Sequence, residues 1–509
     1  MSLLGLDVGT TGAKAVAFNL QGQAIASAYR EYPLHSPRPG WQELDPNQVW
    51  QCLTEVLGEV ALKTAADPIQ TLAISSQGEA VHAVDGSGAC ITNSVVTFDA
   101  RTSEIPQWWL ERMSRMEIAQ ISGMPLHGMY TLNKILWFKQ NCPEIYKKAS
   151  KWLCYEDFVH YRLGLEPVIS HSLAARTMAL DVQAGQWSDT LLRIADIDMG
   201  LLARTAPSGE VVGTIPNRVA DAIGLPHGIV VVTGGHDQPA GALGAGILKS
   251  GEALYATGTV ECICPIFHQY AVTEKTVDSN LCCYPSCVQG LYASIAFNFT
   301  GGSLLRWYRD TLGKAELAES LSTGQDVYDI LCGEVSLEPE NLLVLPHFTV
   351  TGTPHFDTQS RGAIVGLTLG TSRQELVGAL LSGVTYEMKL NLEMLQGAGV
   401  QISQLRAAGG GAKSAVWVQR KADILGVPVA VLNTSEAASL GVAMLGGAAT
   451  GLVSNIRDVI DNVVTILRIH EPDVHRVERF NEMFEMYKRL YPALKDLNHL
   501  LASRSGQGN

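Results

Sequence analysis

The segment LLGLDVGTTGAKAVAF, residues 3–18, contains an apolar strand, Leu3–Val8, a turn rich in glycine and threonine, and a second strand, Ala13–Phe18. Asp7 lies near the end of the first strand, and Gly9–Gly12 form the turn. Such a turn can direct several backbone N–H groups and two threonine hydroxyls toward a phosphate, while the carboxylate holds Mg²⁺ directly or through water. The segment therefore predicts a phosphate loop. From these residues alone, a plain hairpin turn with a capping Asp is an equally good interpretation.

A similar hairpin recurs near the middle of the chain, where Ala253–Ala256 and Val260–Phe267 flank the turn Thr257-Gly258-Thr259. The repetition predicts an internal duplication, with domains at 1–247 and 248–495, the second closed by a helix at about His475–Leu490. Two such turns facing each other would hold a nucleotide's phosphates from both sides. The second turn has no counterpart of Asp7, so the repeat is weak at the level of sequence.

Strands alternate with helical patterns along the chain, which indicates an α/β fold. Apolar runs at Thr71–Ser75 and Ile229–Thr233 have the composition of strands. The stretches Pro46–Leu62 and Leu132–Lys148 have the apolar spacing of helices.

Length and composition favour a compact protein of at least two domains. The chain has 509 residues, of which 46% are hydrophobic and 17% charged, with a net charge of −13. This balance disfavours nucleic acid and anionic membranes as partners. The 10 cysteines are scattered and lack paired CxxC spacing, so we expect neither a disulfide framework nor a metal site. The chain begins with an apolar strand rather than a basic leader, so we expect a cytoplasmic protein.

A glycine turn at 409–414, GGGAKS, follows the predicted strand Leu405–Ala408 and precedes an amphipathic helix. The chain has no GxxxxGK[ST] sequence, which excludes a P-loop. Three glycines let the backbone approach a flat ligand such as adenine, and close packing of helix on strand is the alternative.

Asp237, in VVTGGHDQPAG at 231–241, follows an apolar strand and a pair of glycines at the start of a small-residue helix. A carboxylate that projects from this position into the space between two domains can accept a hydroxyl proton as a general base. Taken alone, the residue fits a helix N-cap better than a general base, because Asp fills that position well.

Taken together, these segments resemble the FGGY family of carbohydrate kinases. The resemblance rests on Leu4–Ala17, Gly234–Gly246, the turn Thr257-Gly258-Thr259 and Ala408–Gly426, in family order. The run MYTLNKILWFKQN at 129–141 fits the family's N-terminal signature, and Gly362–Ser382 fits the second signature imperfectly. The resemblance is nearest to the xylulokinase branch.

The resemblance implies an actin-like fold, with a ribonuclease-H-like core in each domain and a catalytic cleft between them. It implies transfer of the γ-phosphoryl group of ATP to a hydroxyl of a small sugar, ketose or polyol, with Mg²⁺. The implied partners are this substrate and ATP, with no nucleic acid and no membrane, in a homodimer. A sugar-sensing regulatory protein with little turnover is the alternative function.

By position, the resemblance makes Asp237 the catalytic base and Asp7 the Mg²⁺-associated acid. The implied nucleotide-binding residues are Thr10, Thr11, Gly12, Lys14, Thr257, Gly258, Gly302, Arg306, Gly410, Gly411 and Ala415. Ala415 departs from the Asn common in glycerol kinases, which leaves that contact to adenine in doubt.

The predicted sugar-binding residues are Gly78, Glu79, Asp99, Arg101, Tyr130, Asp237 and Gln238. Gly78-Glu79 stand where xylulokinases carry Met-His and glycerol kinases carry Arg-Glu. Glu79 could accept hydrogen bonds from two vicinal hydroxyls, with an exposed loop acid as the alternative, and Gly78 would leave space for a larger sugar. His236, in place of the family's frequent Gly, and Gly352-Thr353-Pro354 are further departures, so the sequence does not identify the sugar.

Overall fold

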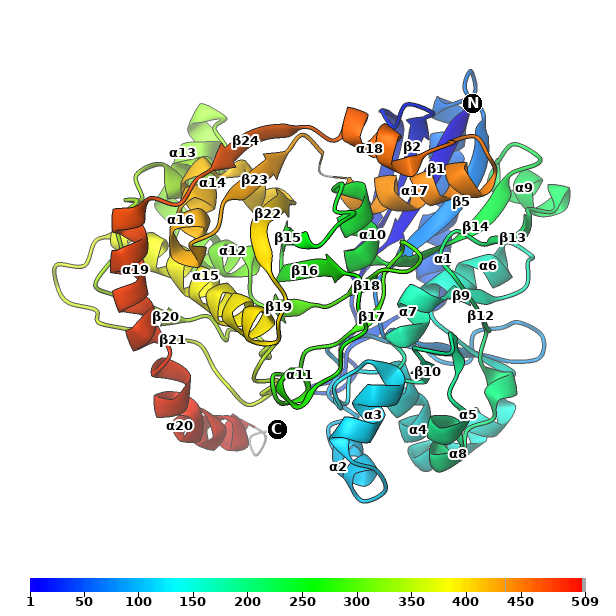
Figure 1. The fold of residues 1–509 in the computed structure, drawn as a ribbon, viewed down its shortest axis with the longest axis horizontal. Helices are drawn as coiled ribbons and strands as arrows, with labels where there is room; N and C mark the ends of the chain where they lie inside the picture. Colours follow the sequence, from blue (N-terminus) through cyan, green and yellow to red (C-terminus); the bar gives the residue numbers. More distant parts are fainter. Residues whose placement is uncertain (435, 506–509) are drawn as a thin grey trace.

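The computed structural model describes residues 1–434 and 436–505 and forms two α/β lobes side by side (Figure 1). The first lobe is built on a six-stranded sheet with the order β13-β14-β5-β1-β2-β3. Its strands are β1 (Ser2–Val8), β2 (Gly12–Asn19), β3 (Ala24–Glu31), β5 (Ile69–Ser76), β13 (Val211–Thr214) and β14 (Val230–His236). β1, β5 and β14 run parallel, with Leu4 opposite Leu72 and Leu72 opposite Val231. All three strands are almost entirely buried, as expected for parallel strands covered on both faces.

The second lobe is built on a sheet with the order β17-β18-β16-β15-β22-β23-β24, with β19 also paired to β16. Its strands are β15 (Gly251–Thr257), β16 (Glu261–Phe267), β17 (Tyr284–Pro285), β18 (Tyr292–Ala293), β19 (Ala296–Asn298), β22 (Ile402–Ala408), β23 (Val429–Leu432) and β24 (Ile466–His470). β15, β22 and β23 are parallel, and β16 and β24 run antiparallel to their neighbours.

The two sheets have matching topologies. β15, β16, β22, β23 and β24 correspond in order and direction to β1, β2, β5, β14 and β13. The structure therefore supports the internal duplication predicted from the two hairpins, and the two-domain α/β architecture is confirmed.

Further helices and short strands surround the first sheet. They are β4 (Glu43–Leu44), α1 (Pro46–Lys63), β6 (His82–Val84), β7 (Ser94–Val95), α2 (Ile105–Leu110), α3 (Arg115–Ser122), α4 (Thr131–Asn141), α5 (Pro143–Lys148), β8 (Lys151–Leu153), α6 (Tyr155–Arg162), β9 (Val168–Ser170), α7 (His171–Ala175), β10 (Leu180–Asp181), β11 (Gln186–Trp187), α8 (Asp189–Ala195), the 3₁₀ turn Met199–Leu201, β12 (Arg204–Ala206), α9 (Asn217–Ile223) and α10 (Asp237–Gly244).

The second half adds α11 (Glu274–Asp278), α12 (Gly302–Thr311), α13 (Lys314–Thr323), α14 (Val327–Gly333), β20 (Leu343–Leu345), β21 (Ala363–Val365), α15 (Arg373–Gly397), the 3₁₀ turn Gly410–Lys413, α16 (Ala415–Leu425), α17 (Ala437–Ala449), α18 (Ile456–Val463), α19 (Val474–Tyr487) and α20 (Leu490–Ser505).

Two of the predicted helices differ from the structure. The stretch Leu132–Lys148 forms two helices, α4 and α5, because Pro143 lacks a backbone N–H and begins the second one. The C-terminal helix expected at about 475–490 is α19, and α20 follows it after a short break.

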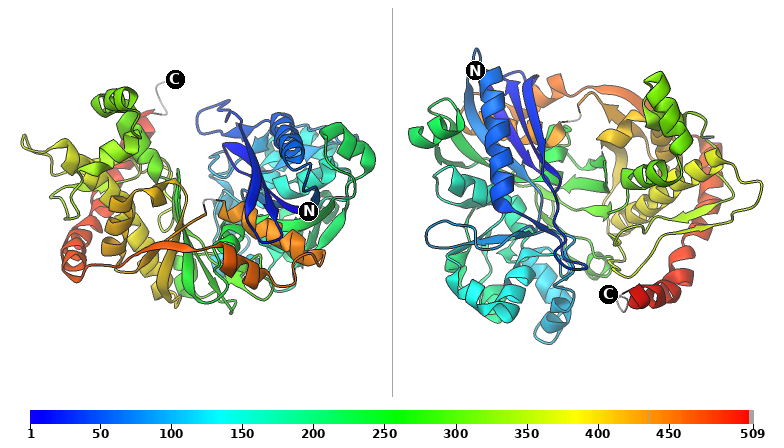
Figure 2. Two further views of the ribbon diagram at one scale, coloured as in Figure 1. Left: turned by 90° about the horizontal axis from the view of Figure 1, so that it is seen from above. Right: turned by 180° about the vertical axis from the view of Figure 1, so that it is seen from behind.

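In residues 1–434 and 436–505, three connections link the lobes, one of them at the boundary near residue 248 that the sequence predicts. The chain passes from α10 to β15, returns from β23 to α17, and passes again from α18 to β24. α17 lies in the second half of the sequence but covers β1, β5 and β14 of the first sheet. Figure 2 shows β24 running from α18 on one lobe to the other lobe. α17, which belongs to the second predicted domain, therefore forms part of the core of the first.

α10 and α17 pack directly on each other through glycines. A Cβ at Gly441 would lie 2.1 Å from the carbonyl oxygen of Ala240, and one at Gly244 would lie 1.7 Å from that of Ala437. Only glycine permits this approach, which explains the small-residue composition of 437–449. No helix within residues 1–434 and 436–505 is long and apolar enough to cross a membrane.

Candidate active site

The predicted site residues of the first half come together at the carboxyl ends of three adjacent parallel strands. Asp7 lies in β1, Gly78 and Glu79 follow β5, and Asp237 follows β14. In open α/β sheets, ligands bind at this edge.

Hydrogen bonds within the turn and to Tyr32 and Gln77 hold the turn after β1 in place. The Gly9 N–H donates to the Gly12 carbonyl at 3.0 Å, and the Gly9 carbonyl accepts from Tyr32 Oη at 2.5 Å and from Gln77 Nε2 at 2.9 Å. Thr10 Oγ1 donates to Gln77 Oε1 at 3.1 Å, and Thr11 is exposed. The turn is thus fixed from behind and leaves its outer face to a ligand. Gln77, which the sequence analysis did not select, is the residue that joins this turn to β5.

Asp7 is largely withdrawn from solvent and accepts a hydrogen bond from Ser75 Oγ at 2.7 Å. Burial raises its pKa, the Ser75 hydroxyl lowers it, and the nearby Glu436 carboxylate raises it further. Lys14 Nζ lies 2.5 Å from Glu436 Oε1 and partly offsets this charge. Lys14, predicted to bind nucleotide, therefore already contacts an acid at the start of α17.

The surroundings of Asp7 fit Mg²⁺. Among the described residues no group of three or more His, Cys, Asp or Glu side chains could hold a metal on its own. Mg²⁺ in phosphoryl-transfer sites typically takes one or two carboxylates and completes its shell with phosphate oxygens and water. A single buried carboxylate next to a phosphate turn has that donor set.

Asp237 is the first residue of α10, and His236 occupies the N-cap position. The alternative interpretation of Asp237 as an N-cap is therefore wrong. Burial raises its pKa to about 7, with further contributions from the charges of Asp7 and Glu79. A carboxylate whose pKa lies near neutrality is suited to accept a proton from a hydroxyl.

Glu79 is buried, so its interpretation as an exposed loop acid is also wrong. Its Oε1 accepts from Arg176 Nε at 2.6 Å, and its Oε2 accepts from Thr97 Oγ1 at 2.9 Å. The side chains of Glu79 and Arg176 are 3% and 5% exposed. The residue adopts φ of 62°, in the left-handed region that is uncommon for a residue other than glycine. Arg176 escaped sequence reasoning because it belongs to no motif. A lone arginine in an apolar stretch was its only signal.

Tyr130 and Gln238 each place a buried polar atom without a partner among the described residues. The Tyr130 hydroxyl and Gln238 Oε1 have no hydrogen bond. The Arg176 guanidinium lies 5.4 Å from the centre of the Tyr130 ring. Buried polar atoms are normally satisfied in proteins, so these two are suited to a polar ligand.

Gly78 does not leave the open space that the sequence suggested. A Cβ at this position would lie 2.9 Å from His236 Nε2 and 3.1 Å from His236 Cδ2. The imidazole of His236 fills the volume that a side chain at 78 would take. This corrects the expectation that Gly78 enlarges the pocket for a bigger sugar.

Asp99 and Arg101 contact each other rather than an open pocket. Arg101 donates from Nε to Asp99 Oδ1 at 2.8 Å and from Nη2 to Glu43 Oε1 at 2.6 Å, and its guanidinium stacks on Trp41. The Asp99 and Arg101 side chains are 0% and 2% exposed. The geometry therefore favours a structural role over the predicted direct contact with substrate.

The second predicted turn lies at the corresponding edge of the second sheet. Thr257 Oγ1 donates to the Ala408 carbonyl at 3.1 Å, and the Gly302 N–H donates to the Gly258 carbonyl at 2.9 Å. Gly409 has φ of 105°, and a Cβ there would lie 2.7 Å from the Thr257 carbonyl oxygen, so glycine is required. These contacts bring together Thr257, Gly258, Gly302 and the glycine turn that contains Gly410 and Gly411. Arg306 is exposed on α12, one turn after Gly302.

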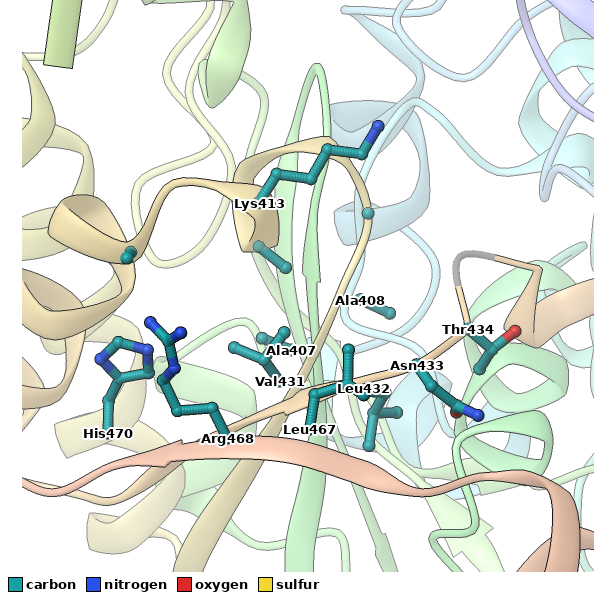
Figure 3. A pocket seen from close by; sticks show the side chains of 13 residues that line it. Ala407, Ala408, Lys413, Val431, Leu432, Asn433, Thr434, Leu467, Arg468 and His470 are labelled. Carbon is teal, nitrogen blue, oxygen red and sulfur yellow. The ribbon is translucent and has the colours of Figure 1, made fainter. Parts of the chain in front are cut away.

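A cavity of about 450 Å³ opens beside the glycine turn (Figure 3). Gly409, Ala412 and Ala415 line it from the turn and the start of α16, and β23 and β24 form its opposite wall. Arg468 and His470 lie at one end, and Asn433 and Thr434 lie at the other, where the chain leaves the second sheet. Of the predicted nucleotide residues, Ala415 contacts this space.

Comparison with known proteins gives a consistent result along the chain. The model for the FGGY family of carbohydrate kinases matches as an N-terminal domain over residues 2–244 and as a C-terminal domain over residues 253–450. A xylulose kinase of Bacillus subtilis (strain 168) is 26% identical over 98% of this chain and 99% of its own length. A gluconokinase of the same organism is 27% identical over 99% of this chain and 97% of its own length. The solved structure of a xylulose kinase from Rhodospirillum rubrum is 25% identical, with a TM-score of 0.84, and covers 98% of this chain and 100% of its own.

Proposed function

The chain belongs to the FGGY family of carbohydrate kinases and uses ATP to phosphorylate a hydroxyl of a carbohydrate, and on this premise we propose that its acceptor is a small uncharged ketose or polyol. The observation that carries the proposal is the charge of the site. Asp7, Glu79 and Asp237 are acidic, and the Arg176 guanidinium is already paired with Glu79. A sugar acid would bring a further carboxylate to a site whose arginine is neutralised, which is unfavourable.

The relatives are divided on this point, because those at similar identity include both a xylulose kinase and a gluconokinase. The charge of the site supports an uncharged acceptor, like that of the xylulose kinase, rather than a sugar acid, like that of the gluconokinase. A sugar-sensing protein with little turnover would not need an acid with a raised pKa at position 237, and no observation favours that alternative.

In the proposed mechanism, Asp237 accepts the proton of the acceptor hydroxyl as its oxygen attacks the γ-phosphorus. The new O–P bond forms while the bond between the γ-phosphorus and the β,γ-bridging oxygen breaks, and ADP leaves. Tyr130 Oη and Gln238 Oε1 hold hydroxyls of the acceptor. The N–H groups of the turns at 9–12 and 257–259 receive the phosphates.

Asp7 would hold Mg²⁺, which supplies positive charge to the phosphates when it is bound. The adenosine portion is assigned to the segments Gly302–Arg306 and Gly409–Ala415, with the cavity beside Ala415 as the space for the base. A homodimer in the cytoplasm stays a prediction.

The test is ADP release with a panel of pentuloses, hexuloses, polyols and sugar acids. We expect stimulation by an uncharged ketose or polyol, and loss of that stimulation in Asp237→Asn. A sugar acid as the best acceptor would overturn the argument from charge. ATP consumption that no sugar stimulates would overturn the assignment of an acceptor site.

A further inference from the structure

His236 lies between the loop that follows β5 and Asp237, the proposed general base. Its imidazole Nε2 lies 3.2 Å from Asp237 Oδ1, and the same ring fills the volume above Gly78. The side chain is 6% exposed. His236 therefore forms a wall next to the group that receives the acceptor's proton.

The other ring nitrogen is fixed by the second half of the chain. His236 Nδ1 lies 3.0 Å from the hydroxyl of Tyr284, and Tyr284 is completely buried in β17. β17 lies against α7 of the first lobe. Cys283, just before β17, and Cys287, just after it, also form hydrogen bonds with residues of that lobe. The imidazole thus cannot swing freely away from Gly78, because its partner belongs to a docked segment.

The ring is neutral. Burial and the nearby Arg176 guanidinium lower the pKa of His236 well below its usual value. The contact with Asp237 is consequently a polar one between a neutral imidazole and a carboxylate. What the ring contributes next to the base is mainly shape, together with one polar nitrogen.

We infer that His236 is a specificity-determining residue whose imidazole, seated over Gly78, limits the length of the carbon chain that can reach Asp237. The inference rests on the proposed function and extends it, because it limits the uncharged acceptor to one with a short carbon chain. Glycine at 78 and histidine at 236 act as a pair, because the volume that one position lacks is supplied by the other. A larger residue at 78 requires a smaller one at 236.

The experiment compares kcat/KM for pentuloses and hexuloses in the wild type, His236→Ala, His236→Gln, Gly78→Ala and the double variant Gly78→Ala/His236→Ala. His227→Ala, which alters an exposed histidine of the same lobe, is the matched control. We expect His236→Ala to raise the ratio of hexulose to pentulose kcat/KM at least about tenfold, the effect of a change in pocket size on discrimination. His236→Gln, which retains length and polarity, should keep the ratio within about threefold of the wild type.

The methyl group of Gly78→Ala would lie 2.9 Å from His236 Nε2 and strain the packing next to Asp237, so we expect kcat/KM for the pentulose to fall about tenfold while the KM for ATP is unchanged. Its effect should largely disappear when His236 is already Ala, which a double-mutant cycle measures as coupling. Melting temperatures separate these effects from loss of fold. If His236→Ala unfolds, folded Gly78→Ala decides, because an unchanged kcat/KM for the pentulose in that variant also overturns the inference.

Two other outcomes overturn the inference in a protein that phosphorylates a ketose. One is an unchanged hexulose-to-pentulose ratio in folded His236→Ala, and the other is strict additivity of the two substitutions. A wild type that no ketose or polyol stimulates contradicts the proposed function instead, so the two failures are distinguishable.

Discussion

Glu79 and Arg176 form a buried ion pair at the sugar side of the site, with Arg176 Nε 2.6 Å from Glu79 Oε1. The pair joins the loop after β5 to the residue that follows α7, about a hundred positions away in the sequence. Both charges are shielded from water, so each one depends on the other for its solvation.

Glu79→Ala should lower the free energy of unfolding by about 3–5 kcal/mol, because it leaves the Arg176 guanidinium buried and unpaired. Urea unfolding measures this loss. Glu79→Ala/Arg176→Met removes both charges and should recover most of the stability. If Glu79 also accepts hydrogen bonds from the sugar, the folded double variant should still use it less well by about 1–3 kcal/mol in kcat/KM. A double variant with normal sugar kinetics would limit Glu79 to a structural role.

Asp237→Asn keeps the shape of the side chain and removes the proton acceptor. Turnover should fall by about 10²–10⁴-fold while the affinity for ATP changes little. In the wild type, kcat/KM for the sugar should decrease as the pH falls through about 7, because Asp237 has its pKa raised to about 7 and must be ionised to act. Near-normal turnover of the Asn variant would exclude the role of general base.

The same raised pKa makes a prediction about stability. The folded state holds a proton on Asp237 up to a pH at which the unfolded chain, with an ordinary Asp pKa, has lost it. The contribution of this proton to the free energy of unfolding is thus most favourable below the pKa of Asp237 in the unfolded chain, and it is lost as the pH rises through about 7. Asp237→Asn should therefore melt at a higher temperature than the wild type at pH 8, and the difference should shrink toward pH 5. Calorimetry at the two pH values checks the sign.

Local patterns in the sequence were sufficient to predict the hairpins, the α/β class and the acids at the ends of β1 and β14. They could do so because strand, turn and following acid are contiguous, and because the order of motifs resembled a known family. The pairing of Glu79 with Arg176 and the filling of Gly78 by His236 depend on residues far apart in the chain. Spacing along one sequence carries no information about such contacts.

The same limit applies to the assembly of the lobes. Only the fold shows that α17 covers the first sheet although it follows β23 of the second. Asp99 and Arg101 were selected because they match a recurring motif. Their buried contacts with each other and with Glu43 indicate that the residues of a motif can stabilise a loop rather than contact the substrate.

The cavity beside the glycine turn makes the predicted role of Ala415 testable. Ala415 is exposed at the first position of α16, so a larger side chain there should fill the cavity without disturbing the core. Ala415→Leu should raise the KM for ATP by about tenfold or more and leave the KM for the sugar unchanged, since a blocked base pocket costs binding rather than chemistry. Ala315→Leu, on an exposed face of α13, is the matched control. An unaltered KM for ATP would show that the base binds elsewhere.

The two lobes should approach each other when ATP and the sugar bind. The turns at 9–12 and 257–259 belong to different sheets, so ATP phosphates can be held by both only when the lobes approach each other, which also excludes water from the acceptor. We expect a hinge at 245–251, where the chain first crosses between the lobes and where Gly246 and Gly251 adopt φ of 76° and 98°. The structure adds the crossings from β23 to α17 and from α18 to β24, so all three segments must bend together.

Small-angle scattering should therefore record a fall in the radius of gyration when both the sugar and a non-hydrolysable ATP analogue are bound. We expect the glycine contact between α10 and α17 to act as the pivot, because α10 packs on α17 and also contacts strands of both sheets. Gly441→Ala places a methyl group against the Ala240 carbonyl and should reduce both the fall in radius and the turnover. Alanine favours helix over glycine, so this loss cannot arise from helix propensity. Gly86→Ala, at a position with open space around it, is the control. If both ligands bind the wild type and the scattering profile does not change, the lobes do not close on the phosphates, and the turn at 257–259 has a packing role instead.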